Sequence, residues 1–243
     1  MIEIFRALFA PPRDLILLIA ALWIGLAFAE KRSEQYGISK ERLNNLVFCS
    51  LFGYLIGGRA LFALANYSAF VGSPLSLFSL NIDLFDSFGG IVTGILVGIV
   101  YGKRQNLSFW NALDALTPIS AFLAIGIHLS HLAAGTAFGA PMSLPWGIDL
   151  WSATRHPTQI YALIASLVIF GLIWFRKSEL SPGALFLYFT ALSAGAHLFL
   201  EAFRGDSALI LDGFRRAQIV AWLTLAATLI VYDRLLTHKG ENE

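Results

Sequence analysis

Seven long apolar stretches constrain the fold of this chain more than any other feature. They lie at about 15–29, 44–65, 88–102, 113–137, 158–175, 183–203 and 217–234. A helix needs roughly 20 mostly apolar residues to cross a bilayer, because each residue rises about 1.5 Å and lipid cannot satisfy an exposed backbone. Of the 243 residues, 57% are hydrophobic and 14% are charged. We therefore predict an all-α, polytopic integral membrane protein with seven transmembrane helices, in which residues 1–243 form a single transmembrane domain.

The positions of Lys and Arg between these stretches predict the orientation of the chain. Loops that are rich in these residues stay in the cytoplasm. Of the 17 Lys and Arg residues, ten lie on one side of the predicted membrane and six on the other, and Arg59 falls within a span. The side with ten is the cytoplasmic side. The N-terminus is then outside the cell and the C-terminus is cytoplasmic.

Charge and cysteine content exclude two classes of function. The formal net charge is +1, so the chain has no basic field to hold a nucleic-acid backbone. Cys49 is the single cysteine of the sequence, which excludes a disulfide framework and a multi-cysteine metal site. Nucleic acid is therefore not a predicted partner.

Arg59 lies well within the second apolar stretch. Ionisable residues inside a membrane are costly and are functional candidates by default. Gly57 and Gly58 precede Arg59, and we expect their missing side chains to leave room for a ligand. We interpret Arg59 as a buried cation that holds an anion such as a phosphate. The alternatives are a snorkelling arginine or an arginine that pairs with Asp83 or Asp86.

Four of the five histidines lie at membrane depth or at its edge, namely His128, His131, His156 and His197. The first two are three residues apart and share one helical face. His197, Glu201 and Arg204 follow an i, i+4, i+7 spacing and share a face of the sixth stretch. This clustering predicts a polar site within the membrane.

Three interpretations of the cluster stay open at this point. A membrane-embedded transfer reaction needs a group that accepts a proton near neutral pH, which a histidine or a hydrogen-bonded glutamate supplies. A zinc or iron site could use four ligands, His128, His131, His197 and Glu201. Hydrogen bonding between the fourth, fifth and sixth spans is the structural alternative, at about 1 kcal/mol per bond.

The segment ATRHPTQIYA at 153–162 resembles the R-H-P-[ST]-Q-[LI]-Y-E signature of bacterial prolipoprotein diacylglyceryl transferases. Arg155, His156, Gln159 and Tyr161 stand at the signature positions. The resemblance continues in order along the chain, through GGRALF at 57–62, FGG at 88–90, GIHLSHLAAGTAFG at 126–139 and EAFRGD at 201–206.

The resemblance implies a multi-pass enzyme of the bacterial plasma (inner) membrane. Such an enzyme moves a diacylglyceryl group from phosphatidylglycerol to the lipobox cysteine thiol of a prolipoprotein, and it needs no metal or organic cofactor. The implied partners are an anionic phospholipid and the prolipoprotein signal peptide or a partner membrane protein. The rival hypothesis is a non-catalytic paralogue that binds phospholipid or a membrane partner as a structural or accessory subunit.

The resemblance and the polar cluster together predict the site residues. The catalytic candidates are His156, His197 and Glu201. The candidates for substrate binding are Arg59, Gly89, Gly90, His128, His131, Arg155, Gln159, Tyr161 and Arg204. No residue is assigned to a metal. We expect Arg59 and Arg204 to line one cavity with the three catalytic candidates and to hold the headgroup of an anionic lipid.

The chain departs from the family pattern at several polar positions. His128 and His197 stand where the family has arginines, and His131 stands where it has an asparagine. Phe88 replaces the histidine of the family's H-G-G motif. Histidine lacks the bidentate fork of arginine and need not be charged, so these exchanges weaken a phosphate clamp. They predict a polar cavity that has been reshaped rather than emptied.

Overall fold

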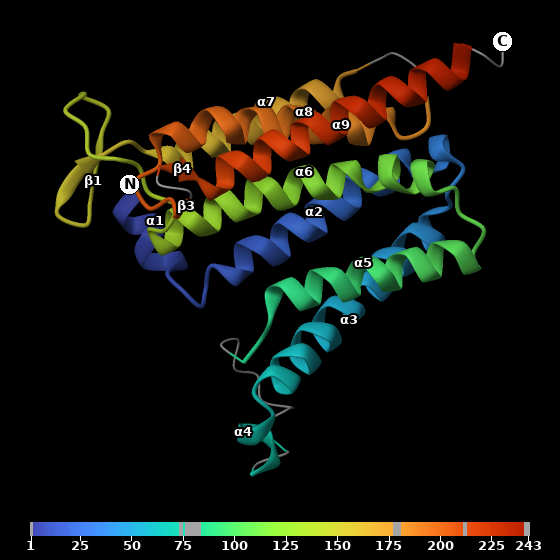
Figure 1. Ribbon diagram of the computed structural model, residues 1–243, viewed down its shortest axis with the longest axis horizontal. Helices are drawn as coiled ribbons and strands as arrows, with labels where there is room; N and C mark the ends of the chain where they lie inside the picture. The colour runs from blue at the N-terminus through green and yellow to red at the C-terminus, as the bar shows by residue number, and fades with distance from the viewer. Residues whose placement is uncertain (1, 73–74, 76–83, 177–180, 211–212, 241–243) are drawn as a thin grey trace. The chain divides into compact units, whose positions relative to one another are not determined.

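The computed structural model describes residues 2–72, 75, 84–176, 181–210 and 213–240, and the fold is all-α with two short β-hairpins (Figure 1). The helices are α1 (Ile2–Phe9), α2 (Leu15–Ser33), α3 (Lys40–Ala65), α4 (Tyr67–Val71), α5 (Ser87–Arg104), α6 (Phe109–Ala134), α7 (Thr158–Trp174), α8 (Ala184–Leu200) and α9 (Arg216–Gly240). Two 3-10 turns cover Glu34–Tyr36 and Glu201–Phe203. Antiparallel pairs join β1 (Ile148–Leu150) to β2 (Ala153–Arg155) and β3 (Leu209–Ile210) to β4 (Phe214–Arg215).

Each of the seven apolar stretches contains a helix, as predicted. Within the described residues, four helices are long and apolar enough to cross a membrane, namely Lys40–Ala65, Phe109–Ala134, Ala184–Phe203 and Arg216–Leu235. The helix of the fifth stretch, Thr158–Trp174, is apolar but shorter. The predicted end of the fourth stretch at residue 137 is wrong. That helix ends at Ala134 because Gly135 adopts a left-handed φ of 69°, which turns the chain.

The chain divides into two compact units, one of residues 1–31 and 116–243 and the other of residues 32–115. In the second unit α3 packs against α5 through small residues. A side chain at Gly90 would place its Cβ 2.9 Å from the backbone oxygen of Tyr54, and one at Gly94 would be 2.9 Å from that of Ser50. Helix association in lipid depends on such close backbone approach, because lipid tails are as apolar as the helices themselves.

In the first unit, α2 packs on α6, and α7, α8 and α9 run side by side (Figure 1). Gly25 brings α2 close to α6, since a Cβ there would be 2.9 Å from the Cα of Ile119. An aromatic cluster then joins α2, α6 and α7 through Phe28, Phe122 and Phe170, with ring centroids 4.6–5.4 Å apart. These contacts fix the three helices against one another.

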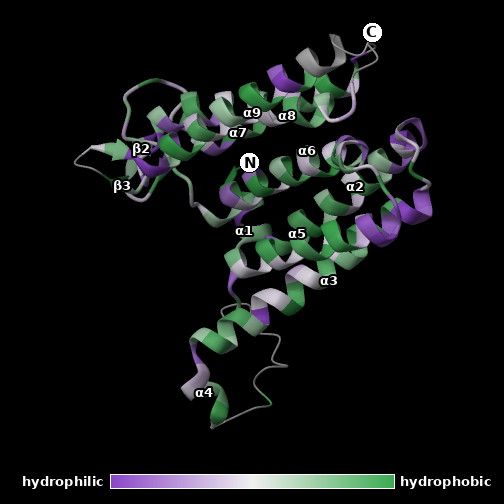
Figure 2. Cartoon of the chain, turned by 45° about the vertical axis from the view of Figure 1, so that its right-hand side comes forward, coloured by the Kyte–Doolittle hydropathy of each residue, from purple (hydrophilic) through white to green (hydrophobic). Residues whose placement is uncertain are grey.

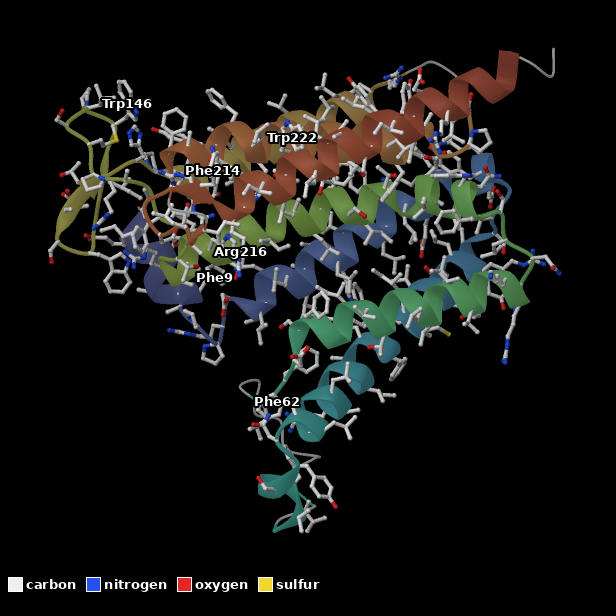
Figure 3. All side chains as sticks on the ribbon, in the orientation of Figure 1. Phe9, Phe62, Trp146, Phe214, Arg216 and Trp222 are labelled. Carbon is white, nitrogen blue, oxygen red and sulfur yellow. The ribbon has the colours of Figure 1, made fainter. Side chains whose placement is uncertain are left out.

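Large apolar side chains also cover the outside of the helices. Figure 2 shows hydrophobic residues along α7 and α9. Trp222 of α9 and Phe214 of β4, both labelled in Figure 3, are exposed. In a water-soluble protein such a surface would be an aggregation hazard, but a helix that faces lipid needs it. The exposed apolar surface therefore agrees with helices that lie in a membrane.

At one end of the first unit, three loop segments join into a small roof over the helices. The segment 138–141 lies between the stretch that ends at Arg155 and the stretch at 203–205. Its backbone bonds join Ala140 N to Phe203 O and Gly205 N to Phe138 O, both at 2.8 Å, and His156 N to Ala140 O at 3.1 Å. These bonds place the loop residues relative to the ends of α6, α7 and α8.

Candidate functional site

A cavity of about 350 Å³ lies within the first unit, between α6, α7 and α8. Its size is at the lower end of the range for small-molecule sites. Its lining residues with a histidine, amide or charged side chain, which we call the polar group, are His128, His131, Gln159, His197, Glu201 and Arg204. The hydroxyl residues Thr158, Ser166 and Ser193 also line it. Small or apolar residues complete the wall, among them Ala124, Ala162, Ala165, Ile169 and Ala196. All six members of the polar group were predicted from the sequence as site residues.

The polar and apolar linings are separated along the helices. The polar group comes from the last two turns of α6, the end of α8 with the turn that follows, and the first turn of α7. Ala162, Ala165 and Ile169 follow along α7, away from the roof. From Gln159 to Ile169 the helix rises about 15 Å. The cavity is thus polar near the roof and mostly apolar deeper in the bundle, where Ser166 and Ser193 add two hydroxyl groups.

The two histidines of α6 lie on one face, as their spacing predicted. The ring centroids of His128 and His131 are 6.2 Å apart. Across the cavity, the Nδ1 atom of His197 is 3.9 Å from a carboxylate oxygen of Glu201. Among the described residues, no three His, Cys, Asp or Glu side chains converge as ligands of one metal ion. The geometry therefore offers no support for the metal interpretation.

Glu201 is the buried acid of the site, with 2% of its surface exposed. The hydroxyl of Ser207 donates to its Oε1 at 2.5 Å. Its Oε2 is 3.7 Å from Nη1 of Arg204, whose Nε donates to Asp206 at 2.7 Å. Arg204 therefore faces two carboxylates, so much of its charge is already compensated within the protein.

Arg215, in β4, positions the turn that carries Glu201. Its Nη1 donates to the backbone oxygen of Glu201 at 2.9 Å, to Oγ of Ser207 at 3.0 Å and to the backbone oxygen of Arg204. A single guanidinium nitrogen thus contacts the backbone at the acid, the backbone three residues after it and the hydroxyl that holds its carboxylate. Arg215 was not predicted as a site residue, because the only feature of the sequence that marked it was its place on the side with fewer Lys and Arg residues.

The first turn of α7 is tied to the loop after α6. The hydroxyl of Thr158 donates to the backbone oxygen of Ala137 at 2.7 Å, and Nε2 of Gln159 donates to that of Thr136 at 2.8 Å. Gln159 is 2% exposed, and its Oε1 has no hydrogen-bond partner among the described residues. Gln159 is one of the residues that line the cavity.

Arg155, His156 and Tyr161 lie together in the roof and the start of α7, and they are not among the residues that line the cavity. Arg155 donates from Nε to Leu150 O at 3.0 Å and from Nη1 to Gly139 O at 3.3 Å, so it braces the loops. The hydroxyl of Tyr161 is 3.5 Å from Nδ1 of His156. These contacts give the three residues a role in shaping the roof.

Gly139 and Gly205 allow the segments of the roof to pack closely. A Cβ on Gly139 would collide with the backbone oxygen of His156, and one on Gly205 would lie 2.6 Å from the backbone oxygen of Gly139. Gly139 also forms a β-bridge with Arg204. Bare backbone at Gly139 and Gly205 therefore lets the stretch at 203–205, and with it Arg204, pack against the rest of the roof.

Arg59 belongs to the second unit, where its Nη1 donates to the backbone oxygen of Leu84 at 2.7 Å. The room that we expected beside it is filled, because side chains at Gly57 and Gly58 would meet Thr93 and the ring of Phe85. Asp83, one of its two expected partners, lies outside the described residues.

Asp86, the other expected partner, caps α5 by accepting a hydrogen bond from the backbone of Gly89. A side chain at Gly89 would meet Leu61, and one at Gly90 would meet Tyr54. These two glycines thus serve helix packing here, and their binding of substrate stays a prediction.

The sequence model described as prolipoprotein diacylglyceryl transferase matches residues 15–233 of the chain. The chain belongs to this family. Three phosphatidylglycerol–prolipoprotein diacylglyceryl transferases illustrate the relationship. That of Clostridioides difficile (strain 630) is 28% identical over 231 residues, which cover 93% of this chain and 91% of the relative. That of Clostridium tetani (strain Massachusetts / E88) is 25% identical, covering 84% and 85%. That of Nostoc sp. (strain PCC 7120) is 27% identical, covering 88% and 81%.

Membership of the prolipoprotein diacylglyceryl transferase family confirms the resemblance found in the sequence. The family consists of polytopic membrane proteins of the bacterial inner membrane, which agrees with the apolar helices of this chain. Within the family, this member has its cavity polar group built around histidines and one compensated arginine.

Proposed function

We propose that this protein is a phosphatidylglycerol–prolipoprotein diacylglyceryl transferase of the bacterial plasma membrane. Its family and the activity of its relatives support the proposal. The observation that carries it is the cavity of the first unit, which joins a polar group to an apolar wall. A lipid needs both parts, because its headgroup must find hydrogen bonds while its chains must stay out of water.

The proposed reaction is a displacement at carbon. The thiolate of the lipoprotein cysteine attacks the glyceryl carbon that carries the phosphate, a C–S bond forms and the C–O bond to the phosphate breaks. Glycerol phosphate leaves with the electron pair of the broken bond. The thiol proton goes to a base of the protein, which makes the sulfur nucleophilic.

We assign the role of general base to Glu201 and His197 together, because the carboxylate oxygen and the imidazole nitrogen lie 3.9 Å apart at the cavity wall. His156 is the third proposed catalytic residue, in the roof beside Tyr161. Arg204 supplies positive charge for the leaving phosphate, although Glu201 and Asp206 compensate part of it. The remaining proposed contacts to substrate come from Arg59, Gly89, Gly90, His128, His131, Arg155, Gln159 and Tyr161.

The test uses purified protein, phosphatidylglycerol and a lipobox peptide, with the thioether product and released glycerol phosphate measured by mass spectrometry. We expect Glu201→Gln and His197→Gln to lower turnover by a factor of 100 or more, the typical contribution of general base catalysis. Gln218→Leu, a change of a residue of α9 that bonds to Leu198 O, serves as the control. Full turnover in Glu201→Gln would show that the assigned base is wrong.

A non-catalytic lipid-binding protein is the second candidate function, and a specific observation favours it. Among the described lining residues there is one arginine, whose charge two carboxylates compensate, and His128 and His197 stand at two positions where the family pattern has arginines. Co-purified phospholipid without any thioether product would support this second function and contradict the first.

We also propose that the chain crosses the membrane seven times, with its N-terminus outside and its C-terminus in the cytoplasm. Single cysteines at Gln35 and Leu75, in a chain with Cys49→Ser, test this by labelling from either side of the membrane. Reaction of both from the same side would contradict the topology. The proposed single domain predicts one unfolding transition for the whole chain.

A further inference from the structure

The amide of Gln159 is held in one orientation. Its Nε2 donates to the backbone oxygen of Thr136 at 2.8 Å, and a carbonyl oxygen can only accept, so the nitrogen of the amide must be the atom that faces Thr136. The Oε1 atom therefore points elsewhere. It is buried and has no hydrogen-bond partner among the described residues. The residue as a whole is 2% exposed.

Three nearby protein donors are already engaged. The hydroxyl of Thr158 donates to Ala137, and that of Ser207 donates to Glu201. Arg204 is directed to Asp206 and lies near Glu201. A buried acceptor without a partner costs about 1–3 kcal/mol, so such atoms in folded proteins almost always find a donor. Gln159 lines the cavity, where a bound molecule can supply the donor.

The charge around the cavity selects the kind of donor. Oε1 is a neutral acceptor, and the one carboxylate of the lining, Glu201, already accepts from Ser207 and faces Arg204. An ammonium group would need several acceptors or an uncompensated carboxylate. A neutral hydroxyl needs only one acceptor. Gln159 also stands at the polar end of its helix, with Ala162 and Ala165 beneath it for an acyl chain.

We propose that Oε1 of Gln159 recognises a free hydroxyl on the headgroup of a phospholipid bound in this cavity. The inference rests on the proposed function only in placing a lipid there. It makes Gln159 a residue that selects polyol headgroups over headgroups of equal charge and size that lack a hydroxyl. Removing the hydroxyl from the lipid leaves Oε1 unpaired, whereas removing the acceptor from the protein leaves the hydroxyl without its partner.

The experiment measures the binding of three short-chain lipids to the detergent-purified full chain by native mass spectrometry. The lipids are phosphatidylglycerol, phosphatidylpropanol, which has the same charge but no hydroxyl, and phosphatidylethanolamine, which offers an ammonium. We expect the wild-type protein to prefer phosphatidylglycerol over phosphatidylpropanol by about tenfold. Ala162→Phe, which fills the cavity, identifies the part of the binding that belongs to it.

In Gln159→Leu the preference should fall to about onefold, while Gln218→Leu, the same change at a residue of α9 that does not line the cavity, should keep it. Equal binding of phosphatidylglycerol and phosphatidylpropanol by the wild type overturns the inference but leaves the lipid site in place, and this result does not depend on the folding of any variant. Stronger binding of phosphatidylethanolamine overturns it in favour of an ammonium ligand. If Ala162→Phe leaves the binding of every lipid unchanged, the lipids do not bind in this cavity, and both the lipid site and the inference are wrong.

Discussion

Replacing Arg215 by methionine should lower the catalytic rate without changing any residue that lines the cavity. The change keeps an unbranched side chain but removes the nitrogen that donates to Glu201 O, Ser207 Oγ and Arg204 O. Two backbone oxygens then lose a donor. The hydroxyl of Ser207 also loses the contact that orients it toward the Glu201 carboxylate.

The size of the effect follows from the two N–H bonds of that nitrogen, which the three acceptors share. Hydrogen bonds that involve a charged group contribute about 1.5–3 kcal/mol each, and the half-buried position of Arg215 reduces this to about 1 kcal/mol each. The sum is about 2 kcal/mol. If the transition state bears this cost, kcat/KM falls about 30-fold, since 1.36 kcal/mol corresponds to a factor of ten.

The assay is thioether formation from phosphatidylglycerol and a lipobox peptide, together with chemical unfolding of each variant. We expect kcat to carry the loss while KM for the lipid stays within about twofold, because Arg215 does not line the cavity. The neighbouring Arg216→Met is the matched control, since Arg216 is exposed at the start of α9 (Figure 3). Its unfolding free energy should change by less than about 0.5 kcal/mol.

Arg215→Lys should recover part of the lost rate, because an ammonium can still donate to one or two of the same oxygens. The reasoning is refuted if Arg215→Met matches Arg216→Met in both rate and stability. A loss of stability with full kcat would leave Arg215 as a brace of the fold and remove its effect on Glu201.

Three further predictions concern other contacts. Gly139→Ala should destabilise the protein by about 1–3 kcal/mol, because its Cβ meets the His156 backbone, whereas Gly171→Ala, with open space around it, should not; thermal unfolding compares the two. Thr158→Val should cost about 1–3 kcal/mol in chemical unfolding by leaving the buried oxygen of Ala137 without its donor, and an unchanged midpoint would contradict this. Replacing Arg59 by lysine should weaken the co-purification of anionic lipid and replacing it by leucine should abolish it, so unchanged lipid in the leucine variant would make Arg59 structural.

The histidines and acid of the site were predictable because their signal is local. His128 and His131 share a face through helical spacing alone, and His197 and Glu201 are neighbours through the same spacing. The expected helical position of Arg204 is wrong, because α8 ends at Leu200 and Arg204 is extended after the 3-10 turn. Spacing gives the face of one helix but not its neighbour. The packing of α6, α7 and α8 decided which of these faces meet around the cavity. It also decided that His156 lies in the roof and not among the residues that line the cavity.

The space expected beside Arg59 could not be predicted from the sequence. A glycine lacks a side chain whether the gap holds a ligand or a neighbouring helix, so the sequence cannot separate the two. Thr93 and Phe85 fill the gaps at Gly57 and Gly58, and these contacts join residues more than 25 positions apart in the chain.

The sequence by itself determined the seven helical stretches, the family and the residue types of the site. Apolar length and helical period are properties of neighbouring residues, which no later folding step changes. Tertiary structure alone decided that Arg215 holds the turn of Glu201, that Gly139 and Gly205 let the segments of the roof pack together, and that Oε1 of Gln159 is buried without a partner among the described residues. Each of these is a contact between segments distant in the chain, and hydrogen-bond geometry between such segments exists only once the helices are packed.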